Sequence, residues 1–271
     1  MRKLTIILAA VALTLAATGC NKLKSRSEVN DGVQAFKNAQ YPQAVEHFKA
    51  AVDLDPTFLS AREYLAVAYY QQYIPGAHSP ENDQMADAAY AQFQKVLDQN
   101  PKDELAIMSI ASLFLNQSKW DDAKQWFEKE IAVSPNKADA YYSLGFIVWS
   151  EWYPALGQAL LNAGMRPEDQ FPIKDKKLKA ELKEKWGPVI DEGLKDLDKT
   201  LEINPEYDDA MSYENLLIRE RAFLADTKEE YDQQVKIADG WLDKTLAVKK
   251  MKEEKKAAKQ ASGGIVAEPS K

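Results

Sequence analysis

Four prolines recur in the same sequence context and set the organisation of this chain. Each closes a segment of similar pattern, and these prolines are Pro56, Pro101, Pro135 and Pro205. Twelve residues before them stand the small residues Ala44, Ala89, Ala123 and Gly193, and eight before them stand Phe48, Phe93, Phe127 and Leu197. Pro101 and Pro135 lie 34 residues apart. Because a fixed period of this length is typical of stacked helix pairs, the sequence predicts a helical-repeat protein.

The uninterrupted repeat, residues 104–137, shows what one unit contains. Apolar residues of its first half recur at helical spacing, namely Ile107, Ile110, Ala111 and Phe114. A turn at residues 116–119 follows, and the period resumes with Trp120, Ala123, Phe127 and Ile131 before Pro135 ends the unit. A lone helical hairpin of this kind would expose one apolar face to water. The unit therefore needs neighbours, which the other repeats supply.

The chain resembles the tetratricopeptide repeat (TPR) family over about residues 25–250. The family has a small residue in the first helix of each pair, and it is matched by Gly32, Ala66, Ala111 and Gly145. Asn215 departs from this pattern in the fifth unit. The resemblance implies an all-α, right-handed solenoid of about five helix pairs. It also implies a concave groove lined by the first helices, which in this family binds other proteins.

Two units carry insertions. Pro56 and Pro101 are 45 residues apart, so unit two has 11 extra residues, and the turn residues at 75–80 predict a loop after a first helix that ends near Tyr73. Pro135 and Pro205 are 70 residues apart, so unit four has 36 extra residues. Its three prolines, Pro154, Pro167 and Pro172, are expected to prevent one continuous helix. Residues 174–185 are expected to form a short exposed helix before Trp186.

The first 20 residues have the pattern of an export signal. The basic residues Arg2 and Lys3 are followed by an apolar stretch at residues 4–17 and then by Gly19 and Cys20. This pattern resembles a bacterial lipoprotein signal. An ordinary secretory signal is the alternative. The resemblance implies a signal peptide at 1–19 and a lipidated Cys20 with a tether at 20–27. The repeat pattern predicts a repeat domain at 28–256, and the small, polar, glycine-containing residues at 257–271 predict a disordered tail. In the lipoproteins that the signal resembles, an Asp directly after the cysteine favours retention in the inner membrane. Asn21 stands there instead, so the resemblance implies the outer membrane, with the protein facing the periplasm.

Charge and motif content bear on the function class. The formal net charge is −7, so nucleic acid is not an expected partner. The two histidines, His47 and His78, stand in different repeats, His47 on the expected exposed side of its helix, and no phosphate-binding loop or hydrolase motif occurs. We therefore predict no enzymatic activity, no catalytic residues, no metal site and no cofactor.

The candidate partner-binding residues are those that the repeat alignment places on the inner face of the first helices. They are Phe36, Tyr70, Leu115, Tyr142, Phe146 and Trp149, together with Trp152 at the start of the unit-four insertion. They are apolar and aromatic, unlike the basic residues with which some TPR modules hold acidic tails. The alternative is that the aromatic residues are core, with the insertion packed over the groove.

The sequence thus predicts a lipid-anchored scaffold that mediates protein–protein interactions in the bacterial cell envelope, in assembly or export machinery. Its partners would be an envelope protein or peptide and, through the anchor, the membrane. A carbohydrate-binding or enzyme-accessory periplasmic solenoid is the alternative, which exposed groove aromatics would favour. A purely structural spacer would be favoured by a groove that the chain itself fills.

Overall fold

The computed structural model describes residues 2–77, 79–166 and 168–263, with side chains between residues 19 and 260. The regular structure in these ranges is helical, with ten α-helices and one 3-10 helix and no strand. The chain divides into two compact units, Met1–Val133 and Ser134–Lys271. Among the described residues, none of the helices combines the length and apolarity that a membrane span requires.

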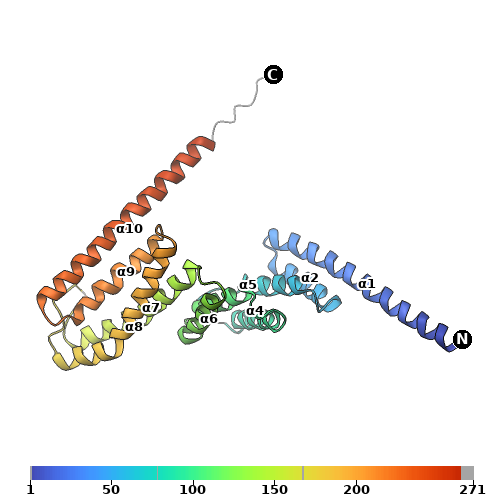
Figure 1. Ribbon diagram of the computed structural model, residues 1–271, viewed down its shortest axis with the longest axis horizontal. Coiled ribbons are helices and arrows are strands. Elements are labelled where there is room, and N and C mark those ends of the chain that lie inside the picture. The colour runs from blue at the N-terminus through green and yellow to red at the C-terminus, as the bar shows by residue number, and fades with distance from the viewer. Residues whose placement is uncertain (1, 78, 167, 264–271) are drawn as a thin grey trace, which may run out of the picture. The chain divides into compact units, whose positions relative to one another are not determined.

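Unit 1 contains three helical hairpins, one for each of the first three predicted repeats. Its helices are α1 (Arg2–Lys37), α2 (Tyr41–Leu54), α3 (Leu59–Tyr70), α4 (Pro80–Gln99), α5 (Glu104–Asn116) and α6 (Trp120–Val133). Each packs on the next along the chain, and the first helices α1 and α3 also touch. The N-terminal part of α1 runs past the end of α2 (Figure 1).

Unit 2 contains the remaining two hairpins. Its elements are α7 (Ala138–Asn162), α8 (Lys176–Ile203), α9 (Asp208–Arg221), the 3-10 helix η1 (Ala222–Leu224) and α10 (Lys228–Gly263). Sequence neighbours pack together here as well, and the first helices α7 and α9 are in contact. The long α10 lies along α9 and extends beyond it (Figure 1).

The repeat alignment is confirmed by the packing at its small residues. A Cβ atom on Gly32 would lie 2.6 Å from the ring of Phe48, and one on Gly145 would lie 2.6 Å from Leu197. Both pairs join the two helices of one hairpin. The alanines predicted at the same contact, Ala44, Ala89 and Ala123, are completely buried. The absence of larger side chains at these positions is what lets each pair of helices approach closely.

The fifth helix pair forms although Asn215 departs from the family pattern. Asn215 is buried, and its Nδ2 donates a hydrogen bond of 2.5 Å to the carbonyl oxygen of Ala238 on α10. A buried amide without such a partner would be unfavourable. In the other repeats a small residue stands at this contact between the two helices. In the fifth repeat the Asn215 hydrogen bond links the two helices instead.

The structure corrects the expected layout of the insertion in the fourth repeat. Pro154 lies inside α7 and Pro188 inside α8, and residues 176–185 are the first part of α8 rather than a separate helix. Both prolines are exposed, so water can bond the carbonyl groups that lose an amide partner. The neighbouring turns are anchored by buried Trp152 and Ile190. The insertion therefore lengthens two helices and leaves a connection at residues 163–175.

Three other boundaries differ from expectation or refine it. The loop of the second repeat begins after Tyr70, and Asn82 closes it through hydrogen bonds of 2.7 to 3.0 Å with Ile74 and Ala77. α10 continues to Gly263 instead of ending near residue 256, and residues 264–271 of the predicted tail lie outside the described ranges. The predicted tether is helical, and its Ser25 is buried and donates to the Ala51 carbonyl oxygen at 2.7 Å.

Candidate functional site: apolar surfaces of the first helices

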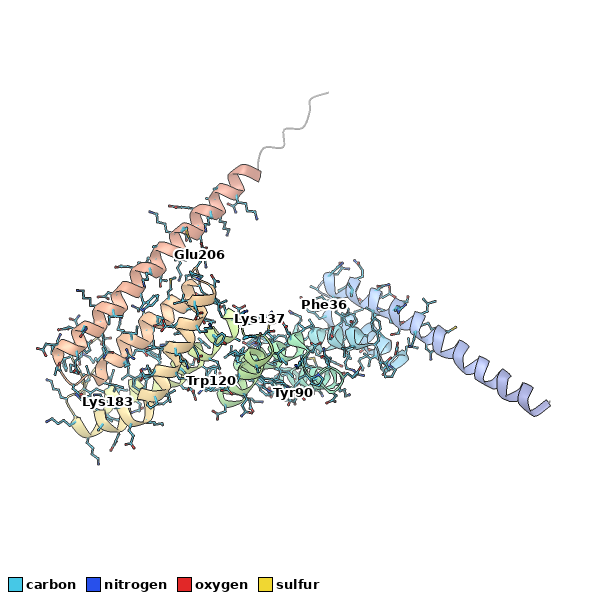
Figure 2. All side chains as sticks on the ribbon, in the orientation of Figure 1. Phe36, Tyr90, Trp120, Lys137, Lys183 and Glu206 are labelled. Atoms are coloured by element: carbon cyan, nitrogen blue, oxygen red, sulfur yellow. The ribbon has the colours of Figure 1, made fainter. Side chains whose placement is uncertain are left out.

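Unit 1 has an open groove of about 520 Å³ on its first helices, here called the α1–α3–α5 groove. Its lining residues are Val33, Phe36, Lys37, Phe48, Glu63, Tyr64, Val67 and Leu105. All of these except Phe48 belong to α1, α3 or α5. Phe36, near the end of α1, is one of the residues that the sequence analysis assigned to the inner face (Figure 2).

The groove presents large apolar side chains to water. Tyr64 is 44 % exposed and Leu105 is 40 % exposed. Both side chains therefore have apolar surface that a ligand can cover. The ring of Tyr64 stacks on Phe48 with 5.5 Å between centroids, which fixes one wall. Contiguous exposed apolar surface of this kind is typical of interaction sites.

Two charged side chains, Lys37 and Glu63, line the groove. Burial raises the pKa of the Glu63 carboxyl, and the nearby carboxylate of Asp103 raises it further. The raised pKa means that the partly buried environment disfavours the charged form of Glu63. The groove is therefore suited to apolar side chains, with Lys37 available to a polar or acidic group beside them.

The other two predicted residues of unit 1 do not line this groove. Tyr70 is half-buried, and its hydroxyl accepts a hydrogen bond of 2.9 Å from Nδ2 of Asn116. Leu115 is partly buried further along α5. Conversely, the alignment columns missed Tyr64 and Leu105. The sequence did contain an indication of their role, because both are large apolar residues that lie outside the periodic apolar positions of their helices.

Unit 2 carries an aromatic cluster on its first helices. It consists of Tyr142, Phe146, Trp149 and Tyr153 on α7, with Tyr207 and Tyr213 on or just before α9. Tyr213 lies 5.8, 5.3 and 5.2 Å from the rings of the first three, and Trp149 stacks on Tyr153 at 5.2 Å. Tyr153 is 52 % exposed and the other α7 members are half-buried. The structure thus brings Tyr142, Phe146 and Trp149 together as predicted.

The structure contradicts the prediction that Trp152 lines the same surface. Trp152 is completely buried and its ring lies 5.5 Å from that of Trp186 on α8. Because α7 continues as a helix through Pro154, Trp152 falls on the stripe of Val148 and Leu156, spaced by four residues. That stripe packs into the core of unit 2, so Trp152 has a structural role.

Comparisons with known proteins concern the fold. No protein-family model and no curated protein matches the sequence. The crystal structure of MamA protein matches with a TM-score of 0.57 and 15 % identity, covering 91 % of this chain and 98 % of that one. MamA 41-end from Desulfovibrio magneticus RS-1 matches with a TM-score of 0.54 and 15 % identity, covering 84 % and 96 %. YrrB, described as a TPR protein with an unusual peptide-binding site, gives 0.49 and 14 %, covering 82 % and 84 %.

The chain has a TPR-like helical-repeat fold. The all-α repeat architecture predicted from the in-phase prolines is thereby confirmed. The sequence identities of these matches are too low to carry a partner or an activity from one protein to another. Arguments about function therefore rest on the surfaces of this chain.

The N-terminal hairpin also holds the predicted lipidation residue and one histidine. Cys20 is exposed on α1 with a free thiol. His47 is less exposed than expected, because its Nδ1 lies 2.8 Å from Oε2 of Glu28, which links α2 to α1. Ligand atoms of Glu28, Asp31 and His47 lie within 4.8 Å of one another, but these side chains are partly or fully exposed and the Glu28–His47 pair accounts for the arrangement. His78 lies outside the described residues.

Proposed function

We propose that this protein is a lipid-anchored scaffold of the bacterial cell envelope that binds an apolar segment of another envelope protein. The observation that carries the proposal is the open α1–α3–α5 groove on the first helices of a TPR-like fold. Those helices present a continuous concave surface in repeat proteins, and such surfaces are used for binding.

A peptide fits the groove better than a carbohydrate does. The lining side chains are aliphatic or aromatic, apart from Lys37 and Glu63. A sugar would need several polar side chains to replace the hydrogen bonds of its hydroxyl groups with water. A peptide can place two or three apolar side chains between Phe36 and Leu105 and keep its backbone in water.

The anchor would hold unit 1 against the membrane. Ser25 is already packed on α2, and it follows Cys20 by five residues of continuous helix. Five helical residues rise by about 8 Å, so a lipid on Cys20 would leave little free tether. The groove would then face partners that lie at or in the same membrane. The outer membrane, on its periplasmic side, is the proposed location.

The groove is tested by a pair of substitutions on one helix. Leu105 and Met108 are 40 % and 42 % exposed on successive turns of α5, but of the two only Leu105 lines the groove. We expect peptides selected from a random display library to carry large apolar residues. Their affinity should fall at least tenfold in Leu105→Glu, because a buried charge replaces an apolar contact, and should stay unchanged in Met108→Glu. Titration calorimetry measures both.

Two outcomes would contradict the groove proposal. One is equal loss of affinity in the Leu105 and Met108 variants, which would indicate a general effect of charge. The other is selection of polar peptides, or of none, together with binding of oligosaccharides on a glycan array. That second result would favour the alternative function of a carbohydrate-binding solenoid.

The anchor is tested by Cys20→Ser. In its native host the wild-type protein should incorporate labelled fatty acid and sediment with the membrane fraction. The variant should lose the label and either remain a precursor or become soluble, because acyl chains supply about 0.8 kcal/mol of membrane affinity per buried CH₂ group. Lys24→Ser, in the same exposed part of α1, should keep the label. A wild-type protein that takes up no fatty acid would refute the anchor.

A further inference from the structure

Unit 2 contains a second hollow, separate from the groove of unit 1. A cavity of about 550 Å³ lies between α7, residues 168–170, the end of α9, η1 and the start of α10. Its walls include the apolar or aromatic side chains of Tyr153, Leu156, Leu160, Phe223 and Tyr231. The volume is within the range of small-molecule sites.

One buried carboxyl group lines this cavity. Glu220, near the end of α9, is 9 % exposed, and its Oε1 accepts a hydrogen bond of 3.0 Å from Nε1 of Trp149. Its Oε2 is buried and has no hydrogen-bond partner among the described residues. A buried acceptor without a partner costs about 1–3 kcal/mol. Glu220 therefore lacks one donor, which a ligand in the cavity can supply.

The electrostatic balance around the cavity favours a cation. Burial raises the pKa of Glu220 to about 7, while the Trp149 hydrogen bond opposes that rise. The other charged groups that line the cavity are Arg219, Glu168 and Asp169. Arg219 is paired with Asp239 at 2.5 Å. Asp169 is likewise paired, because its Oδ1 lies 3.4 Å from the guanidinium of Arg166. The negative charge that remains for a ligand is therefore that of Glu220 and Glu168.

The tyrosines complete the titratable groups of the site. Tyr231 on α10 donates a hydrogen bond of 3.4 Å to the carbonyl oxygen of Asp169, and burial raises the pKa of its hydroxyl. Tyr153 on α7 is 52 % exposed at the edge. Nζ of Lys228 already lies over the Tyr231 ring, 5.3 Å from its centroid. Aromatic faces attract cations and also cover methylene groups, so the exposed ring of Tyr153 suits an ammonium group and the ring of Tyr231 suits the apolar chain that carries it.

We propose that this cavity binds an organic ammonium group carried on an apolar chain, with Glu220 as its counter-ion. The ammonium donates to Oε2 of Glu220, and the rings of Tyr153, Phe223 and Tyr231 surround the chain. The ammonium belongs either to a free alkyl amine or to a lysine side chain of a peptide. The proposal is independent of the groove in unit 1, because the two sites share no residue.

Calorimetric titration of the full chain with 1,5-diaminopentane and with Nα-acetyl-lysine methylamide tests the site. A cation binds the ionised carboxylate, so affinity should fall about 30-fold between pH 8 and pH 5.5, which lies one and a half units below the Glu220 pKa. Glu220→Gln should lose at least tenfold in affinity at pH 8 and lose the pH dependence. Glu253→Gln, exposed on α10, should match the wild type.

A second variant keeps the test decisive if Glu220→Gln folds poorly. Tyr153→Ala changes an exposed residue and should weaken both probes several-fold at both pH values. Binding of the diamine alone indicates a free amine ligand, and binding of the lysine derivative alone indicates a peptide side chain. The proposal is overturned if neither probe binds at millimolar concentration, if hexanoate binds more tightly than both, or if affinity does not change with pH.

Discussion

Replacement of Gly193 by alanine is expected to destabilise unit 2 by about 1–3 kcal/mol, although alanine is the better helix former. Gly193 lies in α8 where it meets α7, and a Cβ atom there would stand 2.8 Å from both Cβ and Cγ1 of Val148. The Cβ atom of a valine is fixed by its backbone, so it cannot rotate away. The two helices would have to separate, and the loss of packing would extend to Leu197 and Gly145 next to them.

Gly240→Ala is the matched control. Gly240 also lies inside a helix of unit 2, but a Cβ atom there would meet nothing within 4 Å. This variant should be more stable than the wild type by up to about 1 kcal/mol, because alanine loses less conformational freedom than glycine. Urea denaturation followed by circular dichroism measures both. If Gly193→Ala were also more stable than the wild type, α7 and α8 would not approach as closely as described.

The fold was predictable because the repeat pattern reports on packing directly. The residues twelve and eight positions before each proline are the contacts within a hairpin, so their spacing fixed the helix pairs without any structure. The insertions were less predictable. Pro154 indicated a break, and a short helix was expected to end before Trp186, yet α7 continues through Pro154 and α8 through Pro188. The gain from burying Trp152 and Ile190 beside these prolines exceeds the loss of one backbone hydrogen bond each. Such a balance depends on tertiary packing, which a local rule does not contain.

The candidate site was predictable only in part. Phe36, Tyr142, Phe146 and Trp149 lie on the expected faces, since the alignment phase was right where the helices are uninterrupted. The prediction for Trp152 was wrong because the face on which it lies depends on whether α7 continues through Pro154, and Trp152 is in fact buried. Glu220 gave no signal, because a carboxyl group in a polar stretch looks solvent-exposed until the insertion is folded over it. The lipid anchor at Cys20 stays a prediction.

The second large effect concerns stability against pH and involves Glu214. This residue is 2 % exposed on α9, and burial raises the pKa of its carboxyl to about 8. The carboxylate of Asp198 adds to the rise, whereas Arg221 and Lys244 oppose it. An acid whose pKa is higher in the folded state binds more protons there than in the unfolded chain. Folding stability therefore decreases as the pH rises from the unfolded pKa to the folded one.

Glu220 and Glu214 contribute over different windows. Both lower the stability between pH 4.5, the ordinary value for glutamate, and about pH 7, where the Glu220 window ends. Between pH 7 and about 8, of the two only Glu214 contributes. In that upper interval the free energy of unfolding of the wild type should fall by roughly 1.4 kcal/mol per pH unit, the value for one proton.

Glu214→Gln should remove this upper slope and reduce the lower one, to which Glu220 then contributes without Glu214. Glutamine has the same shape without the charge, so the variant should be several kcal/mol more stable than the wild type at pH 9 and similar to it at pH 4.5. Glu192→Gln, exposed on α8, should keep the wild-type profile. Urea denaturation at half-unit intervals between pH 4.5 and 9 gives the curves. A wild-type stability that stays constant from pH 7 to 8 would mean that Glu214 ionises as freely in the folded chain as in the unfolded one, and therefore that α9 does not enclose it.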